Sequence, residues 1–242
     1  MKIVAIVQAR MGSTRLPGKV LRDLAGKPML ARVLERVRRA GSVDETIVAT
    51  SDLPGDDPLA DWLAAGRHAC FRGSEQDVLA RFAGAAAQTG ADAIVRITAD
   101  CPLIDPGVMD DVVAAFRAGQ PGLDYASNVL PRRTFPRGLD TEIFTRTALE
   151  TCAREAADAS SREHVTPFIY RHPERFRLHG IEADADYSDH RWTVDTPEDF
   201  ELIEKIYRAL GDAEFSWKDV LRLLAKNSEW SEINRHIAQK TA

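Results

Sequence analysis

The chain is poor in cysteine, and this scarcity limits what can hold it together. Its 242 residues include only three cysteines, Cys70, Cys101 and Cys152. Three cysteines, an odd number at wide spacing, suit neither a disulfide framework nor the paired cysteine spacing of a structural zinc site. We therefore expect a protein of a reducing compartment and predict a cytoplasmic location.

Long apolar runs and an excess of basic residues are also lacking. No stretch approaches the roughly 18 apolar residues of a membrane-spanning helix, and no small-residue cleavage site follows the short apolar run after Lys2. The 32 Lys and Arg residues are outnumbered by 37 Asp and Glu, which gives a net charge of -5. Without a general positive field we expect neither a nucleic-acid nor a membrane partner, so any phosphate binding must be local.

What the sequence has is an alternation of short apolar runs with stretches of helical period. Strands are predicted over residues 3–7, 45–50, 68–72 and 93–98, and helices over 29–39, 58–65, 76–87 and 108–118. The alternation is typical of βαβ units, and near-continuous apolar strands are typical of a parallel sheet covered on both faces. An α/β fold follows.

The pattern loosens in the second half of the chain. Prolines and glycines over residues 120–144 favour loops and an irregular or antiparallel excursion. Beyond it we predict helices over 146–155 and 162–170, a strand pair over 176–182 and 191–194, and helices over 197–210, 217–225 and about 228–237. We expect a main domain at 1–210 and a helical C-terminal extension at 211–242 packed on it.

The stretch QARMGSTRLPGKVL follows the first predicted strand, where open α/β sheets bind ligands. Gly12 and Gly18 would let the backbone approach a phosphate closely, and Arg10, Arg15 and Lys19 would neutralise its charge. The spacing is neither GxGxxG nor GxxxxGK[ST]. The alternative is a solvated basic loop without a ligand.

Two aspartates in other parts of the chain come directly after predicted strands. In TADCPLID, Asp100 would emerge at the carboxyl edge of the sheet, and in RWTVDTPEDFELI, Asp195 would do the same. Carboxylate oxygens suit Mg²⁺ that is also held by nucleotide phosphates, so both are candidate metal ligands. The alternative for Asp100 is a turn cap, and residues 196–199 are explained as a helix start without any function.

Two further stretches offer ligand-binding side chains. In FPRGLDTEIF, Arg137, Asp140 and Glu142 could contact a hydroxylated or carboxylated substrate, or pair with one another at a surface. In RGSEQDVLARF, Arg72 and Ser74 could reach a ligand, or the segment could simply start a helix. There is no HExxH and no G-x-S-x-G in the sequence.

The chain resembles the cytidylyltransferase family that activates acidic sugars in four of these motifs, which follow one another in the order QARMGSTRLPGKVL, TADCPLID, RGLDTEIF and VDTPEDF. That family includes the CMP-Kdo and CMP-sialic acid synthetases, and the likeness is greatest to the branch of the spore coat polysaccharide biosynthesis protein F. The resemblance covers about residues 1 to 210 and implies a three-layer α/β/α, Rossmann-like nucleotide-diphospho-sugar transferase fold. It also implies transfer of CMP from CTP to an acidic sugar for a surface polysaccharide, with Mg²⁺, in a homodimer.

The resemblance also implies roles for individual residues. The catalytic residues would be Arg10, Lys19 and Asp100. The nucleotide would be bound by Ala9, Arg10, Gly12, Ser13, Arg15, Lys19, Arg72 and Ser74. The sugar, or the dimer interface, would lie near Arg137, Asp140 and Glu142. The metal ligands would be Asp100 and Asp195.

The sequence departs from the Kdo and sialic acid synthetases at two points. It has Thr98-Ala99-Asp100 where those enzymes have Gln-Gly-Asp, and Gln8-Ala9-Arg10 where the Kdo enzymes have Pro-Ala-Arg. Two alternatives to the cytidylyltransferase stay open. One is a glycosyltransferase, or a nucleotidyltransferase of different base preference, with the same fold. A glycosyltransferase of this type would normally have an Asp-x-Asp metal motif, and Asp184-Ala185-Asp186 has that pattern. The other is a non-catalytic nucleotide-binding partner.

Overall fold

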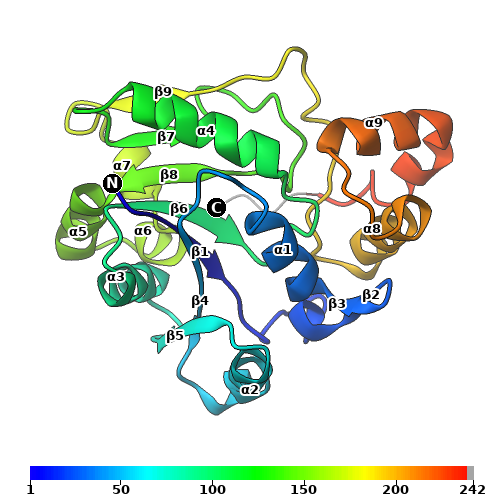
Figure 1. The fold of residues 1–242 in the computed structure, drawn as a ribbon, viewed down its shortest axis with the longest axis horizontal. Helices are drawn as coiled ribbons and strands as arrows, with labels where there is room; N and C mark the ends of the chain where they lie inside the picture. Colours follow the sequence, from blue (N-terminus) through cyan, green and yellow to red (C-terminus); the bar gives the residue numbers. More distant parts are fainter. Residues whose placement is uncertain (239–242) are drawn as a thin grey trace.

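The computed structural model describes residues 1–238, so the last four residues of the predicted extension lie outside it. A seven-stranded sheet runs through the middle of the molecule (Figure 1). Across the sheet the strands are β5 (Ala69–Gly73), β4 (Glu45–Ser51), β1 (Ile3–Gln8), β6 (Ala93–Thr98), β8 (Glu142–Thr145), β7 (Tyr125–Ser127) and β9 (Leu178–Gly180). Among these strands only β8 is antiparallel to its neighbours, which confirms a mostly parallel sheet with a small antiparallel excursion.

Helices cover both faces of the sheet. One face carries α1 (Met29–Val37), α2 (Asp57–Ala65), α4 (Pro106–Ala118), α8 (Pro197–Leu210) and α9 (Trp217–Lys226). The other carries α3 (Val78–Thr89), α5 (Arg146–Glu155), α6 (Ala159–His164) and α7 (Pro167–Tyr170). Alternate residues of β1 enter the two cores, Ala5 on the α1 side and Ile6 on the α3 side, because successive side chains of a strand point to opposite faces. The predicted three-layer α/β/α fold is confirmed.

Short elements complete the chain. They are the 3₁₀ helices η1 (Lys19–Leu21), η2 (Pro54–Asp56) and η3 (Ser228–Glu232), and a small hairpin of β2 (Asp23–Leu24) and β3 (Lys27–Pro28). The hairpin lies beside α8, at the side of the molecule where α8 and α9 are grouped (Figure 1). Among the described helices, none is long and apolar enough to cross a membrane.

The predicted strand pair over 176–182 and 191–194 is wrong. Residues Leu178–Gly180 form β9, but they pair in parallel with β7. The 191–194 segment is used differently: its backbone N–H groups at Trp192 and Val194 donate to the carbonyls of Arg137 and Asp100, both at 2.8 Å. This segment therefore joins the loop that contains Arg137 to the loop that follows β6 and contains Asp100.

Two helix predictions are also corrected. The helix predicted over 162–170 is divided into α6 and α7, because Val165 between them has a φ of 72° and Pro167 begins the second. The helix predicted over about 228–237 is limited to the 3₁₀ turn η3, which ends before Ile233.

The main core extends past residue 210. Phe200 of α8 and Val220 of α9 belong to the same buried cluster as Val33 of α1. The division at residue 210 stays a prediction, and α9 packs on the core that the earlier helices build.

Candidate nucleotide and sugar site

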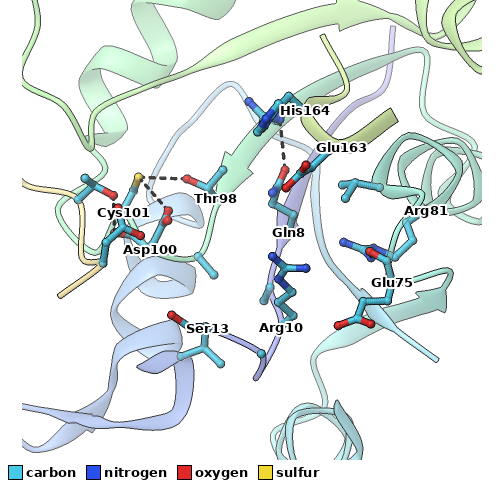
Figure 2. A pocket seen from close by; sticks show the side chains of 18 of the residues that line it. Gln8, Arg10, Ser13, Glu75, Arg81, Thr98, Asp100, Cys101, Glu163 and His164 are labelled. Atoms are coloured by element: carbon cyan, nitrogen blue, oxygen red, sulfur yellow. Dashed lines mark hydrogen bonds between the residues drawn. The ribbon is translucent and has the colours of Figure 1, made fainter. Parts of the chain in front are cut away.

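A cleft of about 1380 Å³ lies at the carboxyl ends of the central parallel strands. Figure 2 shows Gln8 in the middle of the view with Arg10 below it, Thr98, Asp100 and Cys101 on one side, and Glu75 and Arg81 on the other. Most predicted site residues line it: Ala9, Arg10, Gly12, Ser13, Arg15, Lys19, Ser74, Asp100, Arg137, Asp140 and Asp195. The parallel topology brings the residues that follow β1, β5 and β6 together, because the carboxyl ends of these strands meet at one edge of the sheet, whereas Arg137, Asp140 and Asp195 reach the cleft from loops.

The loop after β1 is fixed at several points. The backbone N–H of Met11 donates to the Asp56 carboxylate at 2.6 Å, and that of Gly18 donates to the Met11 carbonyl at 3.0 Å. Gly18 has a φ of 69°, a conformation that favours glycine. Leu16 and Val20 are buried in the core below, whereas Arg10 is exposed. The loop is thus held from beneath with a cationic side chain free to meet a ligand.

Lys19 lies between the two candidate metal ligands. Its Nζ is 3.0 Å from Asp195 Oδ1 and 3.5 Å from Asp100 Oδ2, and it donates to the Val194 carbonyl at 2.6 Å. Its three N–H donors therefore face three acceptors. Lys19 and Asp195, which are more than 170 positions apart in the sequence, therefore meet at this one ammonium group.

Asp195 is surrounded by positive charge. Besides Lys19, its carboxylate pairs with Arg15 at 3.1 Å and Arg191 at 2.9 Å. Burial raises the pKa of Asp195, but Lys19, Arg15 and Arg191 together outweigh burial and lower it below its ordinary value. The carboxylate is therefore ionised at neutral pH.

The Asp100 and Asp195 pair fits Mg²⁺ as part of a shared shell. Among the described residues no group of three His, Cys, Asp or Glu side chains could hold a metal by itself. Two carboxylates facing one cation nevertheless match the habit of Mg²⁺, which takes one or two protein carboxylates and completes its shell with phosphate oxygens and water. Asp100 has the more open side chain, at 29% exposure.

Cys101 next to Asp100 is a structural residue. Its Sγ lies 3.1 Å from Thr98 Oγ1 and 3.5 Å from Asp100 Oδ1, and the residue is buried. Burial, followed by the charge of Asp100, raises the pKa of this thiol well above its ordinary value. A thiol held neutral in this way is a poor nucleophile.

Arg72 and Glu142 are the two predicted site residues that the structure does not bring to the cleft lining. Arg72 pairs with Asp57 at 2.7 Å and donates to the Ser51 carbonyl at 2.9 Å. Glu142 is buried, pairs with Arg96, and accepts hydrogen bonds from Tyr125 Oη at 2.6 Å and Thr166 Oγ1 at 2.7 Å.

Several lining residues were not predicted from the sequence. They include Gln8, Arg81, Arg96, Arg133 and His164. The sequence does contain a feature that could have identified Arg96, since it is the one charged residue in the apolar strand AIVRIT. In the structure its Nε donates to Gln8 Oε1 at 3.2 Å, while Glu142 holds the other side of its guanidinium.

A second cationic group lies in the cleft apart from the β1 loop. Arg133 pairs with both oxygens of Asp140, and Arg137 lies near them. Burial, and then the charge of Arg133, lowers the pKa of Arg137 from its ordinary value. The cleft thus has two separate sets of arginines, which suits a ligand with a phosphate chain and a second molecule with its own polar or acidic groups.

Comparisons with known proteins show which sequences and structures the chain is similar to. A family model described as Cytidylyltransferase matches residues 4–227. The chain is 34% identical over 235 residues to the spore coat polysaccharide biosynthesis protein SpsF of Bacillus subtilis, a match that covers 94% of this chain and 95% of that protein. A solved structure of a cytidylyltransferase from Leptospira borgpetersenii is 33% identical, with a TM-score of 0.91 and 100% of both chains covered.

A shorter match is found with a named sugar enzyme. The 3-deoxy-manno-octulosonate cytidylyltransferase of Geobacter metallireducens is 42% identical over 116 residues, which is 47% of this chain and 44% of that protein. The likeness to this relative is therefore local, whereas the other two extend over nearly the whole chain.

Proposed function

The chain belongs to the cytidylyltransferase family, and from that membership we propose that it transfers CMP from CTP to an acidic sugar of a surface polysaccharide. The observation that carries the proposal is the joint placement of the β1 loop, Asp100 and Asp195 around Lys19 in one cleft. Arg133 and Arg137 offer a second cationic group for the sugar. The names of the Bacillus and Geobacter relatives, which mention a polysaccharide and an acidic sugar, support this choice.

The chemistry follows from in-line phosphoryl transfer. An oxygen–phosphorus bond forms between the sugar hydroxyl and the α-phosphorus, the bond from that phosphorus to the bridging oxygen breaks, and pyrophosphate leaves. The hydroxyl proton passes to water in the cleft. Arg10, Arg15 and Lys19 would hold the triphosphate, so positioning and charge provide most of the rate.

Magnesium is part of the proposal. Asp100 and Asp195 would hold Mg²⁺, which when bound would neutralise charge on the phosphates. Since Lys19 bridges these two carboxylates, phosphate oxygens that attract Lys19 would free them. We propose a homodimer in the cytoplasm on the strength of the family resemblance.

The test is pyrophosphate release with CTP, UTP, ATP or GTP, Mg²⁺ and a panel of acidic sugars. We expect release with CTP and at least one acidic sugar, and Asp100→Asn should lower kcat/KM by a factor of at least about 10³, as expected for lost transition-state stabilisation. Asp111→Asn, an exposed change on α4 outside the cleft, is the matched control.

The same assay separates the alternatives. Release with UTP, ATP or GTP but not CTP would indicate a different base preference, and silence with every pair would favour a non-catalytic nucleotide-binding role. A glycosyltransferase that used Asp184 and Asp186 as its metal motif would need them in the site. Asp184 instead pairs with Lys218, and neither residue is part of the described cleft lining.

A further inference from the structure

Asn234, in the C-terminal segment after η3, reaches the candidate site through buried groups. We infer that Asn234 is a positioning residue, which fixes the orientation of the Asp195 carboxylate through Asp199 and Arg191. The inference deepens the proposed function and rests on it, because the proposed function gives Asp195 its place in the site. No motif of the sequence pointed to Asn234.

The first step is the contact of Asn234 itself. The residue is 3% exposed, and its Nδ2 donates to Asp199 Oδ1 at 2.8 Å and to the Arg191 carbonyl at 2.9 Å. A side-chain amide has two N–H donors, so both have an acceptor. A buried amide that donates to a buried carboxylate is well suited to fix its orientation.

The second step is the Asp199 carboxylate, which is fully buried. Arg191 donates to both of its oxygens, from Nε at 2.9 Å and from a terminal nitrogen at 3.0 Å. The backbone N–H groups of Asp195 and Thr196 donate to Oδ2 at 2.9 and 3.1 Å. Asp199 therefore fixes the backbone at Asp195 as well as the guanidinium beside it.

The third step is the link into the cleft. The same terminal nitrogen of Arg191 that meets Asp199 also donates to Asp195 Oδ2 at 2.9 Å. The other oxygen, Oδ1, accepts from Lys19 Nζ at 3.0 Å. Asp195 Oδ2 is thus shared by Arg191 from within the protein and Arg15 of the β1 loop, and Oδ1 faces Lys19, which also meets Asp100.

This arrangement gives the C-terminal segment a role in the site that helix packing alone would not require. If Asn234 is replaced, Asp199 loses one of the five hydrogen bonds described above, and the Arg191 carbonyl loses the bond from the Asn234 amide. Arg191 and Asp195 would then sample other orientations. The rate of the chemical step should fall, because catalytic groups displaced by a fraction of an ångström lose much of their effect.

The experiment compares Asn234→Leu with Arg235→Ala in the full chain. Leucine has a similar volume but no donor, and Arg235 is an exposed neighbour that pairs with Glu232. We expect kcat for pyrophosphate release to fall by about tenfold or more in Asn234→Leu while KM for CTP stays within about twofold, which is the pattern of a lost transition-state interaction. Arg235→Ala should match the wild type.

A second readout does not depend on activity. Solvent exchange of the Arg191 Nε–H, followed by NMR, should be at least about tenfold faster in Asn234→Leu, since local opening governs such exchange. If Asn234→Leu does not fold, Asn234→Ser takes its place in both measurements.

A lower melting temperature with unchanged kcat and unchanged exchange would overturn the inference. Failure of the proposed function is a separate result, because it shows as a wild-type enzyme that releases no pyrophosphate with any pair. The exchange measurement would still decide whether Asn234 orders Arg191.

Discussion

At the residue scale, the charges of the site are paired before any substrate arrives. Lys19 is 8% exposed and bridges Asp195 and Asp100, and Arg15 shares Asp195 with it. Ion pairs of low exposure are held in place by their neighbours, since breaking one leaves an uncompensated charge. In the proposed reaction, triphosphate and metal would replace these partners together, so nucleotide and metal binding should depend on each other.

Glu142 has a structural role that differs from the one predicted from its sequence motif. The sequence offered it as a sugar contact, but its carboxylate holds Arg96, Tyr125 and Thr166. Burial lowers the pKa of Arg96, but the charge and hydrogen bond of Glu142, with the charges of Tyr125 and Asp140, together outweigh burial and raise it above its ordinary value. Glu142 thus acts on the cleft through Arg96, whose side chain lines it.

The change Glu142→Gln should therefore destabilise the fold. Removal of the charge leaves the Arg96 guanidinium, at 15% exposure, without its carboxylate. We expect a loss of about 3–5 kcal/mol in the free energy of unfolding, measured by urea denaturation. Tyr125→Phe, which removes one hydrogen bond to the same carboxylate, should cost only about 1 kcal/mol. A Glu142→Gln protein of wild-type stability with a raised KM for the sugar would restore the substrate role.

At the element scale, two loops of the cleft are built against each other. Gly138 has a φ of 102°, and a Cβ there would lie 2.7 Å from the Trp192 carbonyl carbon and 2.9 Å from the Thr193 nitrogen. The backbone of Arg137 exchanges hydrogen bonds with His190 and Trp192 across this contact. Only glycine permits the approach, which sets Arg137 beside the segment that leads to Asp195.

The change Gly138→Ala should accordingly cost about 2–4 kcal/mol in the free energy of unfolding, the range of severe single substitutions. Gly26→Ala is the matched control, since Gly26 also has a positive φ, of 90°, but a Cβ there meets nothing within 4 Å. It should cost about 1 kcal/mol from backbone strain alone. Equal losses in the two proteins, compared by thermal and urea melting, would show that the close approach to Trp192 is not needed.

Strong local patterns predicted elements best. The apolar run at β1 and the Pro-initiated helix α4 were predicted to within a residue or two, because period and capping are local properties. The 191–194 segment has a strand-like pattern, but its partners are Arg137 and Asp100, more than 50 and 90 residues earlier. Such partners follow from the tertiary fold, which the local pattern does not contain.

At the scale of the whole molecule, the sequence predicted the half of the site that strand exits define. Arg10, Lys19 and Asp100 come together because the parallel strands β1 and β6 end at one edge of the sheet, whereas Asp195 is brought there by the hydrogen bond from the Val194 N–H to the Asp100 carbonyl. Arg133 follows no strand, and its pairing with Asp140 depends on how the loops of the excursion fold back.

Tyr207 connects α8 to the loop after Asp100 and makes stability depend on alkaline pH. Its hydroxyl donates to the Pro102 carbonyl at 2.6 Å, and burial raises its pKa to about 12 although Arg36 and Arg32 oppose the shift. A raised pKa means that the unfolded chain loses this proton first. The stabilisation of the folded state by the protonated Tyr207 hydroxyl is therefore complete below the ordinary pKa near 10 and is lost as pH rises toward 12.

The change Tyr207→Phe should reduce this pH dependence. From about pH 9 to 12, the wild type should lose roughly 2–3 kcal/mol more of its unfolding free energy than the variant, at 1.36 kcal/mol per unit of pKa difference. At neutral pH the variant should be weaker by about 1 kcal/mol, the value of one hydrogen bond. Urea-denaturation curves of the two proteins at pH 9 and 12 are the measurement, and an equal loss of unfolding free energy in both would contradict the assignment.

In the proposed reaction a sugar hydroxyl attacks the α-phosphorus of CTP, and ³¹P NMR can follow each phosphorus atom of the mixture. With an active acidic sugar, we expect a single phosphodiester resonance for the CMP-sugar, which grows in step with free pyrophosphate while the three signals of CTP disappear. A pair of coupled pyrophosphate-diester resonances, formed only with a sugar 1-phosphate, would contradict it.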